Sequence, residues 1–327
     1  MKVFVTGSSG LLGTNLILEL LKQGFSVKGL IRNLSSYQEI PQDNLELIQG
    51  NIFDDLRPFL VKCDFVIHVA AETDQDLLKY HQYEKINVYG TLNLLEAAID
   101  VGVRKFIYVS SANTIGYSGF SDGEMENIPI KFPFTKSFYA LSKLQAEIAL
   151  LAKMKEIDVV IANPTFMLGA YDVKPTSGKI ILMAINRKFV FHPPGGKNFV
   201  HVNDVAKGLI QCLHYGRNGE KYIFSGENLT YRDFFLLLSK QTGKKLTLIQ
   251  IPQIFLKPLG LLGDIIRKFG IKTRFQSVNM HSLCINNYYD NYKSRQEFDM
   301  KYRPVEEAIK DSLTFLVKRK IGIQKFS

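Results

Sequence analysis

The sequence predicts a doubly wound, parallel α/β sheet followed by a smaller, mainly helical domain. Apolar runs alternate with amphipathic helical patterns through the first half of the 327 residues. The runs are apolar throughout, which is typical of parallel strands that helices cover on both faces. A glycine-rich turn joins the first run to the first helical pattern. Because this length suits about two domains, we predict one domain at residues 1–168 and a second at 169–327.

Six short runs rich in Val, Ile, Leu and Phe supply the strands of the first domain. They lie at residues 2–6, 26–31, 45–49, 64–69, 105–110 and 158–162. Helical patterns fill the gaps between them at residues 11–23, 54–61, 83–101 and 137–155. Right-handed crossovers place these helices on both faces of the sheet, which makes it doubly wound.

The pattern becomes less regular after Pro164. Strands are predicted at residues 199–202 and 221–225. Helices are predicted between the Pro- and Gly-rich clusters 175–178 and 193–196, from Asn203 onwards, and at 231–242 and 305–320. Thr230 has a side chain suited to cap the helix that follows it. A strand near 220–226 can join the sheet of the first domain. We expect the second domain to pack over the carboxyl edge of the strands and to bind the substrate.

The net charge of +10 is concentrated at the end of the chain. Residues 244–327 hold 16 Lys and Arg against 7 Asp and Glu, a net of +9. The simplest interpretation is a solvated basic surface. The alternative is contact with an anionic small molecule or with a membrane surface. We predict no nucleic-acid partner, because no recognised binding motif accompanies the charge.

The sequence argues against several classes of protein. No apolar stretch approaches the ~20 residues of a membrane span, and the opening residues do not resemble a signal peptide. Cys63, Cys212 and Cys284 lie far apart and form no CxxC pair. We therefore predict neither a disulfide framework nor a metal site, and a cytoplasmic protein.

The glycine-rich turn reads TGSSGLLG at residues 6–13. In a dinucleotide-binding turn, the first glycine allows a tight bend and the second lets backbone approach the pyrophosphate. The third lets helix and strand pack closely, and the helix N-terminus supplies N–H groups to the phosphates. Gly7, Gly10 and Gly13 have this spacing, so we predict that the first domain binds NAD or NADP in a Rossmann fold.

The end of the second predicted strand bears on the choice between the two cofactors. An acidic residue there holds the ribose hydroxyl of NAD, and an arginine accommodates the 2′-phosphate of NADP. Here Ile31 takes the usual acidic position and Arg32 follows. We therefore predict NADP(H), with NAD as the alternative.

A proton-transfer pair stands at the start of the predicted helix 137–155. Tyr139 and Lys143 are four residues apart and share one helix face. A tyrosine titrates near ~10, and a neighbouring ammonium lowers that pKa towards the range useful to an acid or base. Ser111, with Ser110 beside it, follows the fifth strand at the edge where such sheets bind ligands.

Taken together, these motifs resemble the extended short-chain dehydrogenase/reductase superfamily, specifically its NAD(P)-dependent epimerase/dehydratase group. The resemblance runs in order through residues 6–13, 50–54, 68–71, 86–98, 109–116, 139–143, 163–165 and 199–208. Residues 171–180, 226–233 and 292–313 are most similar to dihydroflavonol-reductase-like proteins and to the hopanoid-associated sugar epimerase group.

The resemblance implies a role for particular residues. Ser111 would hold the substrate oxygen, Tyr139 would act as acid or base, and Lys143 would lower the tyrosine pKa and bind the nicotinamide ribose. The expected cofactor contacts are Gly7, Ser9, Gly10, Leu11, Leu12, Gly13, Arg32, Asn51, Ile52, Ala70, Ala71, Tyr139, Lys143, Pro164 and Thr165. Asn51 stands where the family usually has an aspartate.

These features favour an NADP(H)-dependent oxidoreductase that reduces a carbonyl, or oxidises an alcohol, on a fairly hydrophobic small molecule. The simplest interpretation of the apolar stretch 251–270 is a helix pair packed on the core. Otherwise the stretch lines an apolar substrate pocket or lies on a membrane surface, and both alternatives suit a hydrophobic substrate. Two alternatives stay open. One is a nucleotide-sugar epimerase or dehydratase with bound NAD(P), and the other is a non-catalytic NADP-binding sensor. The resemblance also implies a homodimer.

Overall fold

Six strands before residue 165 and one later strand form a seven-stranded parallel sheet with the order β10-β6-β5-β4-β1-β2-β3. The computed structural model describes residues 1–37, 39, 42–117, 125–185 and 187–324. The strands are β1 (Lys2–Thr6), β2 (Ser26–Ile31), β3 (Leu45–Gln49), β4 (Phe65–His68), β5 (Lys105–Val109), β6 (Asp158–Pro164) and β10 (Lys221–Phe224). All six strands predicted for the first domain are present, and the doubly wound α/β class is confirmed.

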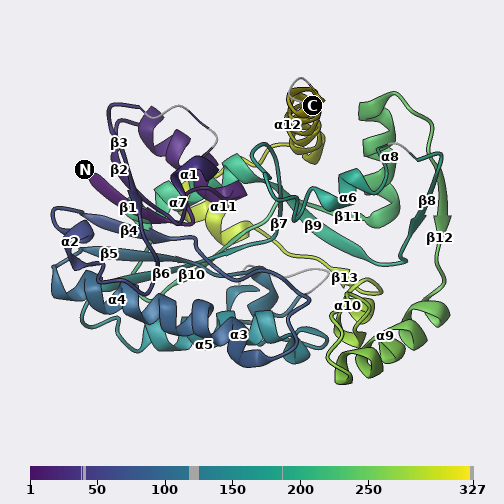
Figure 1. Ribbon diagram of the computed structural model, residues 1–327, viewed down its shortest axis with the longest axis horizontal. Coiled ribbons are helices and arrows are strands. Elements are labelled where there is room, and N and C mark those ends of the chain that lie inside the picture. Colours follow the sequence, from purple (N-terminus) through teal and green to yellow (C-terminus); the bar gives the residue numbers. More distant parts are fainter. Residues whose placement is uncertain (38, 40–41, 118–124, 186, 325–327) are drawn as a thin grey trace.

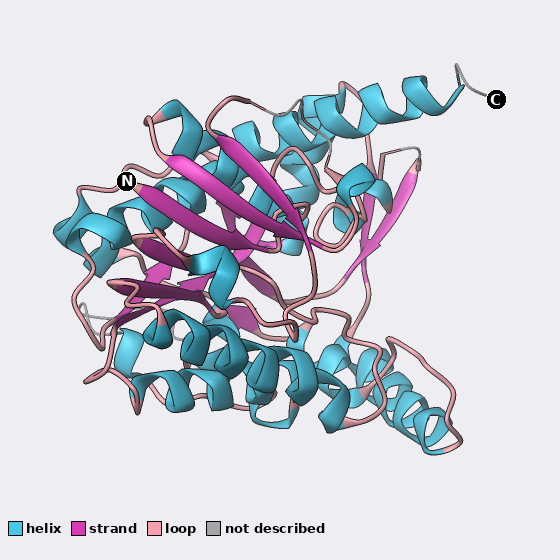
Figure 2. Cartoon of the chain, turned by 60° about the vertical axis from the view of Figure 1, so that its left-hand side comes forward, coloured by secondary structure: helices cyan, strands magenta, loops and turns pink. Residues whose placement is uncertain are grey.

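Helices cover both faces of this sheet (Figures 1 and 2). One face carries α1 (Leu11–Lys22), α7 (Val202–Tyr215) and α11 (Tyr292–Phe298), and the other carries α2 (Arg57–Leu60), α3 (Tyr80–Glu84), α4 (Thr91–Asp100) and α5 (Phe138–Leu151). Side chains of β1 alternate between two apolar cores. Val3 and Val5 pack with α1 and α7, whereas Phe4 packs with α4 and α5. Burial on both faces explains why the strands are apolar throughout.

Two predicted helices are shorter than the sequence pattern indicates. The helix predicted at 54–61 is reduced to α2, with Pro58 in its first turn, where a missing N–H costs nothing. The pattern at 83–101 is interrupted between α3 and α4 by a π-helical segment, Lys85–Gly90. Its buried Asn87 donates to the carbonyl of Glu72 and to Ser142 Oγ and accepts from the N–H of Glu72. The irregular turn therefore ties the loop after β4 to α5.

The second half contains more strands than predicted. A four-stranded sheet joins β7 (Phe166–Leu168), β9 (Gly196–His201), β11 (Glu227–Thr230) and β13 (Asn286–Asn287), and β8 (Phe189–His192) pairs with β12 (Thr247–Gln250). Besides α7 and α11, the helices of the second half are α6 (Lys179–Leu182), α8 (Tyr231–Thr242), α9 (Gln253–Lys268), α10 (Ser277–Ser282) and α12 (Val305–Gln324). The predicted cap of α8 is confirmed, since Thr230 Oγ1 accepts from the N–H of Asp233 at 3.0 Å.

The chain returns to the first sheet after residue 168. Strand β10 pairs in parallel with β6 at the edge of the sheet, and α7 packs along α1. The division of the chain at residue 168 therefore stays a prediction about folding units. Within the described residues, no helix is both long and apolar enough to cross a bilayer.

His68 joins three elements of the first domain. Its Nδ1 lies 2.6 Å from Thr6 Oγ1 on β1, and its Nε2 lies 2.9 Å from Thr91 Oγ1 on α4. Complete burial lowers the pKa of His68 to about 3, since the charged imidazolium is poorly solvated there. The ring is therefore neutral in the folded protein at every pH near neutrality.

This burial predicts an acid-dependent loss of stability that His68→Gln should remove. Because the folded pKa is lowered, the unfolded state binds the proton first as pH falls from about 6.5 towards about 3. The native protein should therefore lose about 2 kcal/mol of unfolding free energy, relative to the variant, between about pH 7 and about pH 5. Urea denaturation at both pH values measures the difference. A gap that does not change with pH would contradict the assignment.

Candidate active site

The turn between β1 and α1 has the close packing that its glycines predict. Gly7 has a φ of +70°, and its carbonyl accepts from the N–H of Gly10 at 3.0 Å. A Cβ on Gly13 would lie 2.1 Å from the Gly7 carbonyl oxygen, and a Cβ on Gly7 would lie 2.8 Å from the N of Ala70. Gly10 is the N-cap of α1 and has no side chain, so no side chain caps the first N–H groups of the helix. These groups are therefore available to a phosphate. This cradle fits a pyrophosphate.

The other predicted cofactor contacts follow strands at the carboxyl edge of the sheet. Ala70 and Ala71 follow β4, and the N–H of Ala70 donates to Thr6 Oγ1 at 3.1 Å. Asn51 and Ile52 follow β3, and Asn51 Oδ1 already accepts from the N–H of Phe53 at 3.2 Å. Arg32 is exposed directly after β2. These residues lie around the turn, as their positions after neighbouring parallel strands require.

Pro164 and Thr165 lie at the end of β6, also on the carboxyl edge. The N–H of Thr165 donates to the carbonyl of Phe224 at 3.1 Å, and its hydroxyl donates to Asn198 Oδ1 at 2.6 Å. These contacts join the first sheet to β9 of the second half. The segment is therefore held between the two halves of the molecule.

The structure separates the two neighbouring serines. Ser111 lies near Tyr139, and its hydroxyl opposes the rise that burial causes in the tyrosine pKa. Ser110 instead points inward and donates to the carboxylate of Glu147. Ser137 caps α5 by accepting from the N–H of Ala140 at 3.3 Å, so the helix begins where Tyr139 faces the loop after β5.

Lys143 lies one turn along α5 from Tyr139 and is almost completely buried. Its Nζ donates to the carbonyl of Val109 at 2.7 Å and lies 4.6 Å from the centre of the Tyr108 ring. Burial lowers the pKa of Lys143 to about 7, and the nearby Glu147 carboxylate opposes that shift. The ammonium therefore sits where a small change of charge nearby alters its protonation.

Glu147, one further turn along α5, is the residue of this region that the sequence motifs did not single out. It is fully buried and its Oε1 accepts from Thr114 Oγ1 at 2.7 Å and Asn163 Nδ2 at 2.9 Å. Its Oε2 pairs with Lys221 Nζ on β10 at 2.6 Å. The signal that could have found it is its i+4 spacing from Lys143, but an acidic residue at that spacing is common on exposed helices.

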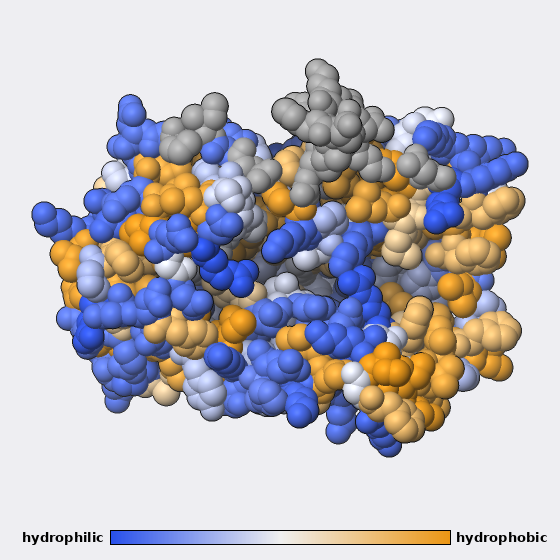
Figure 3. Space-filling model, in the orientation of Figure 1, coloured by the Kyte–Doolittle hydropathy of each residue, from blue (hydrophilic) through white to orange (hydrophobic). Residues whose placement is uncertain are grey.

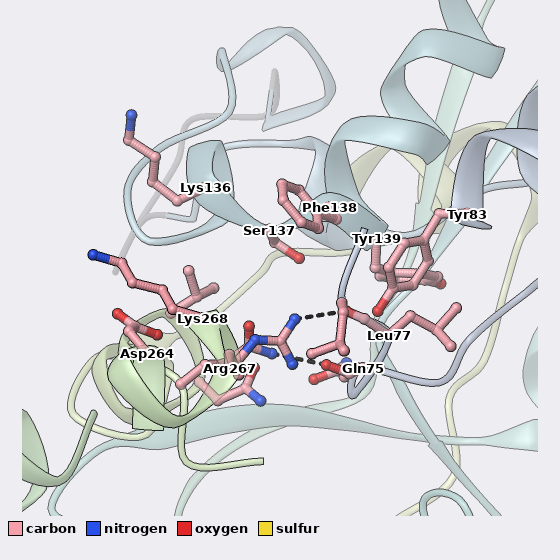
Figure 4. A pocket seen from close by; sticks show the side chains of 14 residues that line it. Gln75, Leu77, Tyr83, Lys136, Ser137, Phe138, Tyr139, Asp264, Arg267 and Lys268 are labelled. Atoms are coloured by element: carbon pink, nitrogen blue, oxygen red, sulfur yellow. Dashed lines mark hydrogen bonds between the residues drawn. The ribbon is translucent and has the colours of Figure 1, made fainter. Parts of the chain in front are cut away.

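A pocket opens beside Tyr139 (Figure 4). Residues from the loop after β4, the start of α5, and helices α9 and α10 line it. Arg267 of α9 donates to the carbonyl of Leu77 at 2.6 Å, which fixes α9 over this loop. The lining includes the cations Lys136, Arg267 and Lys268 and the anion Asp264. The sequence offered the stretch 251–270 as one possible lining of a substrate pocket, but it could not predict that this stretch meets the loop after β4, because the two segments are nearly two hundred positions apart.

Comparison with known proteins identifies the kind of chain that this site belongs to. A family model described as the NAD-dependent epimerase/dehydratase family matches residues 3–224. A protein of Synechocystis sp., provisionally named dihydroflavonol 4-reductase, is 30% identical over 95% of this chain and 93% of its own length. Sterol demethylase protein B of Methylococcus capsulatus is 27% identical over 98% of this chain and 99% of its own length.

A solved structure agrees with these relatives. The crystal structure of gox2253 superposes with a TM-score of 0.82 at 31% identity, and the match covers 97% of this chain and 98% of that one. The similarity therefore extends through the second half of the chain, beyond the residues that the family model matches.

The glycine turn makes separable predictions for two alanine substitutions. Gly13→Ala should lower the free energy of unfolding by about 1–3 kcal/mol, because the new Cβ clashes with the Gly7 carbonyl. Gly10→Ala meets its first neighbour at 3.4 Å, so stability should change by less than about 0.5 kcal/mol. Its Cβ should still weaken dinucleotide binding about tenfold, since backbone must approach the pyrophosphate there.

Denaturation and fluorescence titration of both variants measure the two effects. Equal loss of stability in the two variants, or unchanged dinucleotide affinity in Gly10→Ala, would argue against this cradle as the phosphate site.

Proposed function

This chain belongs to the NAD-dependent epimerase/dehydratase family, and on that premise we propose that it is an NADP(H)-dependent oxidoreductase. It reduces a carbonyl, or oxidises an alcohol, on a fairly hydrophobic small molecule. The observation that carries the proposal is the convergence of Ser111, Tyr139 and Lys143 at the start of α5, with a pocket beside Tyr139. A bound nicotinamide supplies the hydride at this edge of the sheet.

The side chains of this chain supply the proton chemistry. In the direction of reduction, Tyr139 donates its phenolic proton to the oxygen of the substrate, and Ser111 donates a hydrogen bond to the same oxygen. The ammonium of Lys143 stabilises the phenolate that Tyr139 becomes. The Val109 carbonyl holds Lys143 in place at 2.7 Å. Oxidation of an alcohol runs through the same groups in reverse.

Arg32 supports NADP(H) as the exchanged cofactor. It is exposed at the end of β2, where its guanidinium can pair with a 2′-phosphate in two parallel hydrogen bonds. Ile31, which takes the position usual for an acid, is buried and offers no acceptor to a ribose hydroxyl. A reductase that releases its cofactor after each turnover suits this arrangement.

The names of two relatives support a carbonyl compound of considerable apolar area as substrate. One relative is provisionally named a dihydroflavonol 4-reductase, and the other is named sterol demethylase protein B. The cations Lys136, Arg267 and Lys268 in the pocket favour one alternative, a nucleotide-sugar epimerase or dehydratase, because they suit a diphosphate.

A homodimer through α5 is part of the proposal. Ile148 of this helix is 64% exposed, and it lies beside Leu141, Leu144, Tyr80 and Phe138 in an apolar surface depression. Burial of this surface against its copy would remove it from water.

Tyr139→Phe separates an enzyme from a sensor. Turnover of carbonyl substrates should fall at least about a hundredfold, since the variant has no proton to donate. NADPH affinity should stay within about threefold, because the ring is kept. Steady-state kinetics and fluorescence titration measure the two quantities. Unchanged turnover would exclude Tyr139 as the acid.

Cofactor choice is tested on protein stripped of bound nucleotide. We expect NADPH to bind at least about tenfold more tightly than NADH, a difference of about 1.4 kcal/mol. Arg32→Ala should remove this preference without weakening NADH. Equal affinities in the native protein, or NAD that cannot be stripped, would favour the epimerase alternative.

A further inference from the structure

Helix α9 turns its apolar face towards solvent. Ile254, Phe255, Leu261, Leu262 and Ile265 are between 51% and 73% exposed, although large apolar side chains on a helix usually pack on their own protein. At 100° per residue, Ile254, Leu261 and Ile265 form one stripe, and Phe255 and Leu262 lie beside it. Phe269, directly after the helix, is 78% exposed. Apolar surface gathers where Figure 1 places α9 (Figure 3).

The opposite face of α9 makes the contact with the rest of the protein. A Cβ on Gly260 would lie 2.8 Å from the Cα of Ser277, and one on Gly263 would lie 1.4 Å from the Phe275 carbonyl oxygen. These small residues let α9 and α10 approach closely. The helix pair that the sequence predicts is therefore present, but its large apolar side chains lie outside the contact.

Positive charge borders this apolar face. On the helical wheel, Lys257 and Lys268 lie along one side of the stripe, and Lys272 follows the helix. Residues 253–275 hold five Lys and Arg against one acidic residue, Asp264. Arg274 is paired with Asp76 at 2.9 Å, whereas the three lysines are exposed. A surface that combines exposed apolar side chains with flanking lysines is complementary to anionic lipid headgroups over acyl chains.

We propose that the apolar face of α9 docks the protein reversibly on an anionic lipid bilayer. Ile254, Leu261 and Ile265 enter the boundary between headgroups and acyl chains, and Lys257 and Lys272 contact the lipid phosphates. A second copy of this chain fits the face less well. Two-fold packing would bring the flanking lysines of both copies together, which like-charge repulsion opposes.

Docking in this way has a consequence for the pocket. Asp264 and Arg267, which point away from the apolar stripe, line the pocket beside Tyr139, and Lys268 at the border of the stripe reaches the same pocket. A membrane beneath α9 therefore lies next to the pocket. An apolar substrate could pass from the lipid to the site without crossing bulk water, and this last step alone rests on the proposed function.

Vesicle co-sedimentation tests the docking directly and needs no substrate. The full chain is mixed with vesicles of phosphatidylcholine alone or of equimolar phosphatidylcholine and phosphatidylglycerol. We expect binding to the anionic vesicles at low salt, weaker binding as salt increases, and about tenfold less binding to the neutral ones. Protein that stays in the supernatant with the anionic vesicles would overturn the proposal.

Paired variants assign the binding to α9. Phe255→Ser with Leu262→Ser should reduce binding about tenfold or more, because two exposed apolar anchors are lost. The matched control is Val61→Ser with Tyr215→Ser, which removes exposed apolar side chains from the first domain. For charge, Lys257→Glu with Lys272→Glu is compared with Lys22→Glu and Lys155→Glu, which are equally exposed and change the net charge equally.

The controls should bind as the native protein does, and circular dichroism checks that all variants are folded. Equal losses in the α9 variants and their controls would overturn the assignment. Self-association through this face would also overturn it. In that case the variant with Phe255→Ser and Leu262→Ser would have a lower mass by light scattering than the native protein and would keep full vesicle binding.

Discussion

A carboxylate without solvent contact, that of Glu147, ties helix α5 to three strands of the central sheet. Burying an unpaired charge costs several kcal/mol, so the group is stable only while its partners stay in place. Those partners come from separate elements: Lys221 from β10, Asn163 from β6, and Ser110 and Thr114 from the segment after β5. Oε1 accepts from Ser110, Thr114 and Asn163, and Oε2 pairs with Lys221, so removing Lys221 leaves a buried carboxylate oxygen without this partner. Together these contacts hold α5 against the sheet.

The remaining features of the site depend on that position. Lys143 and Tyr139 lie one and two turns before Glu147, so fixing the helix fixes both. Ser110 is turned inward by the same carboxylate, which leaves Ser111 to meet Tyr139. Lys143 is deeply buried, with its pKa lowered to about 7, close to the range in which proton transfer near neutrality is efficient. The ion pair between Glu147 and Lys221 thus fixes the helix that carries Tyr139 and Lys143.

The sequence predicts the central sheet well because each strand is a continuous apolar run that ends where burial ends. It predicts the phosphate turn because only glycine fits there, as the clash of a Cβ on Gly13 demonstrates. The resemblance implied Ser111 rather than Ser110, but the sequence could not give the physical reason, which is that Ser110 turns inward to Glu147. It missed the strands β7, β8 and β11–β13, which are two to four residues long. It also could not predict the contact between Arg267 and the Leu77 carbonyl, which joins segments far apart in the chain.

The central claim is that hydride passes from an exchangeable cofactor to a carbonyl carbon while Tyr139 supplies the proton. In its most direct test, the protein is incubated with a panel of apolar ketones and NADPH that carries deuterium at C4 of the nicotinamide. Mass spectrometry then shows whether the deuterium is transferred to the products. The account predicts an alcohol that carries one deuterium on the former carbonyl carbon. An absence of label from every ketone, together with epimerisation of a nucleotide sugar that takes up no label, would contradict it.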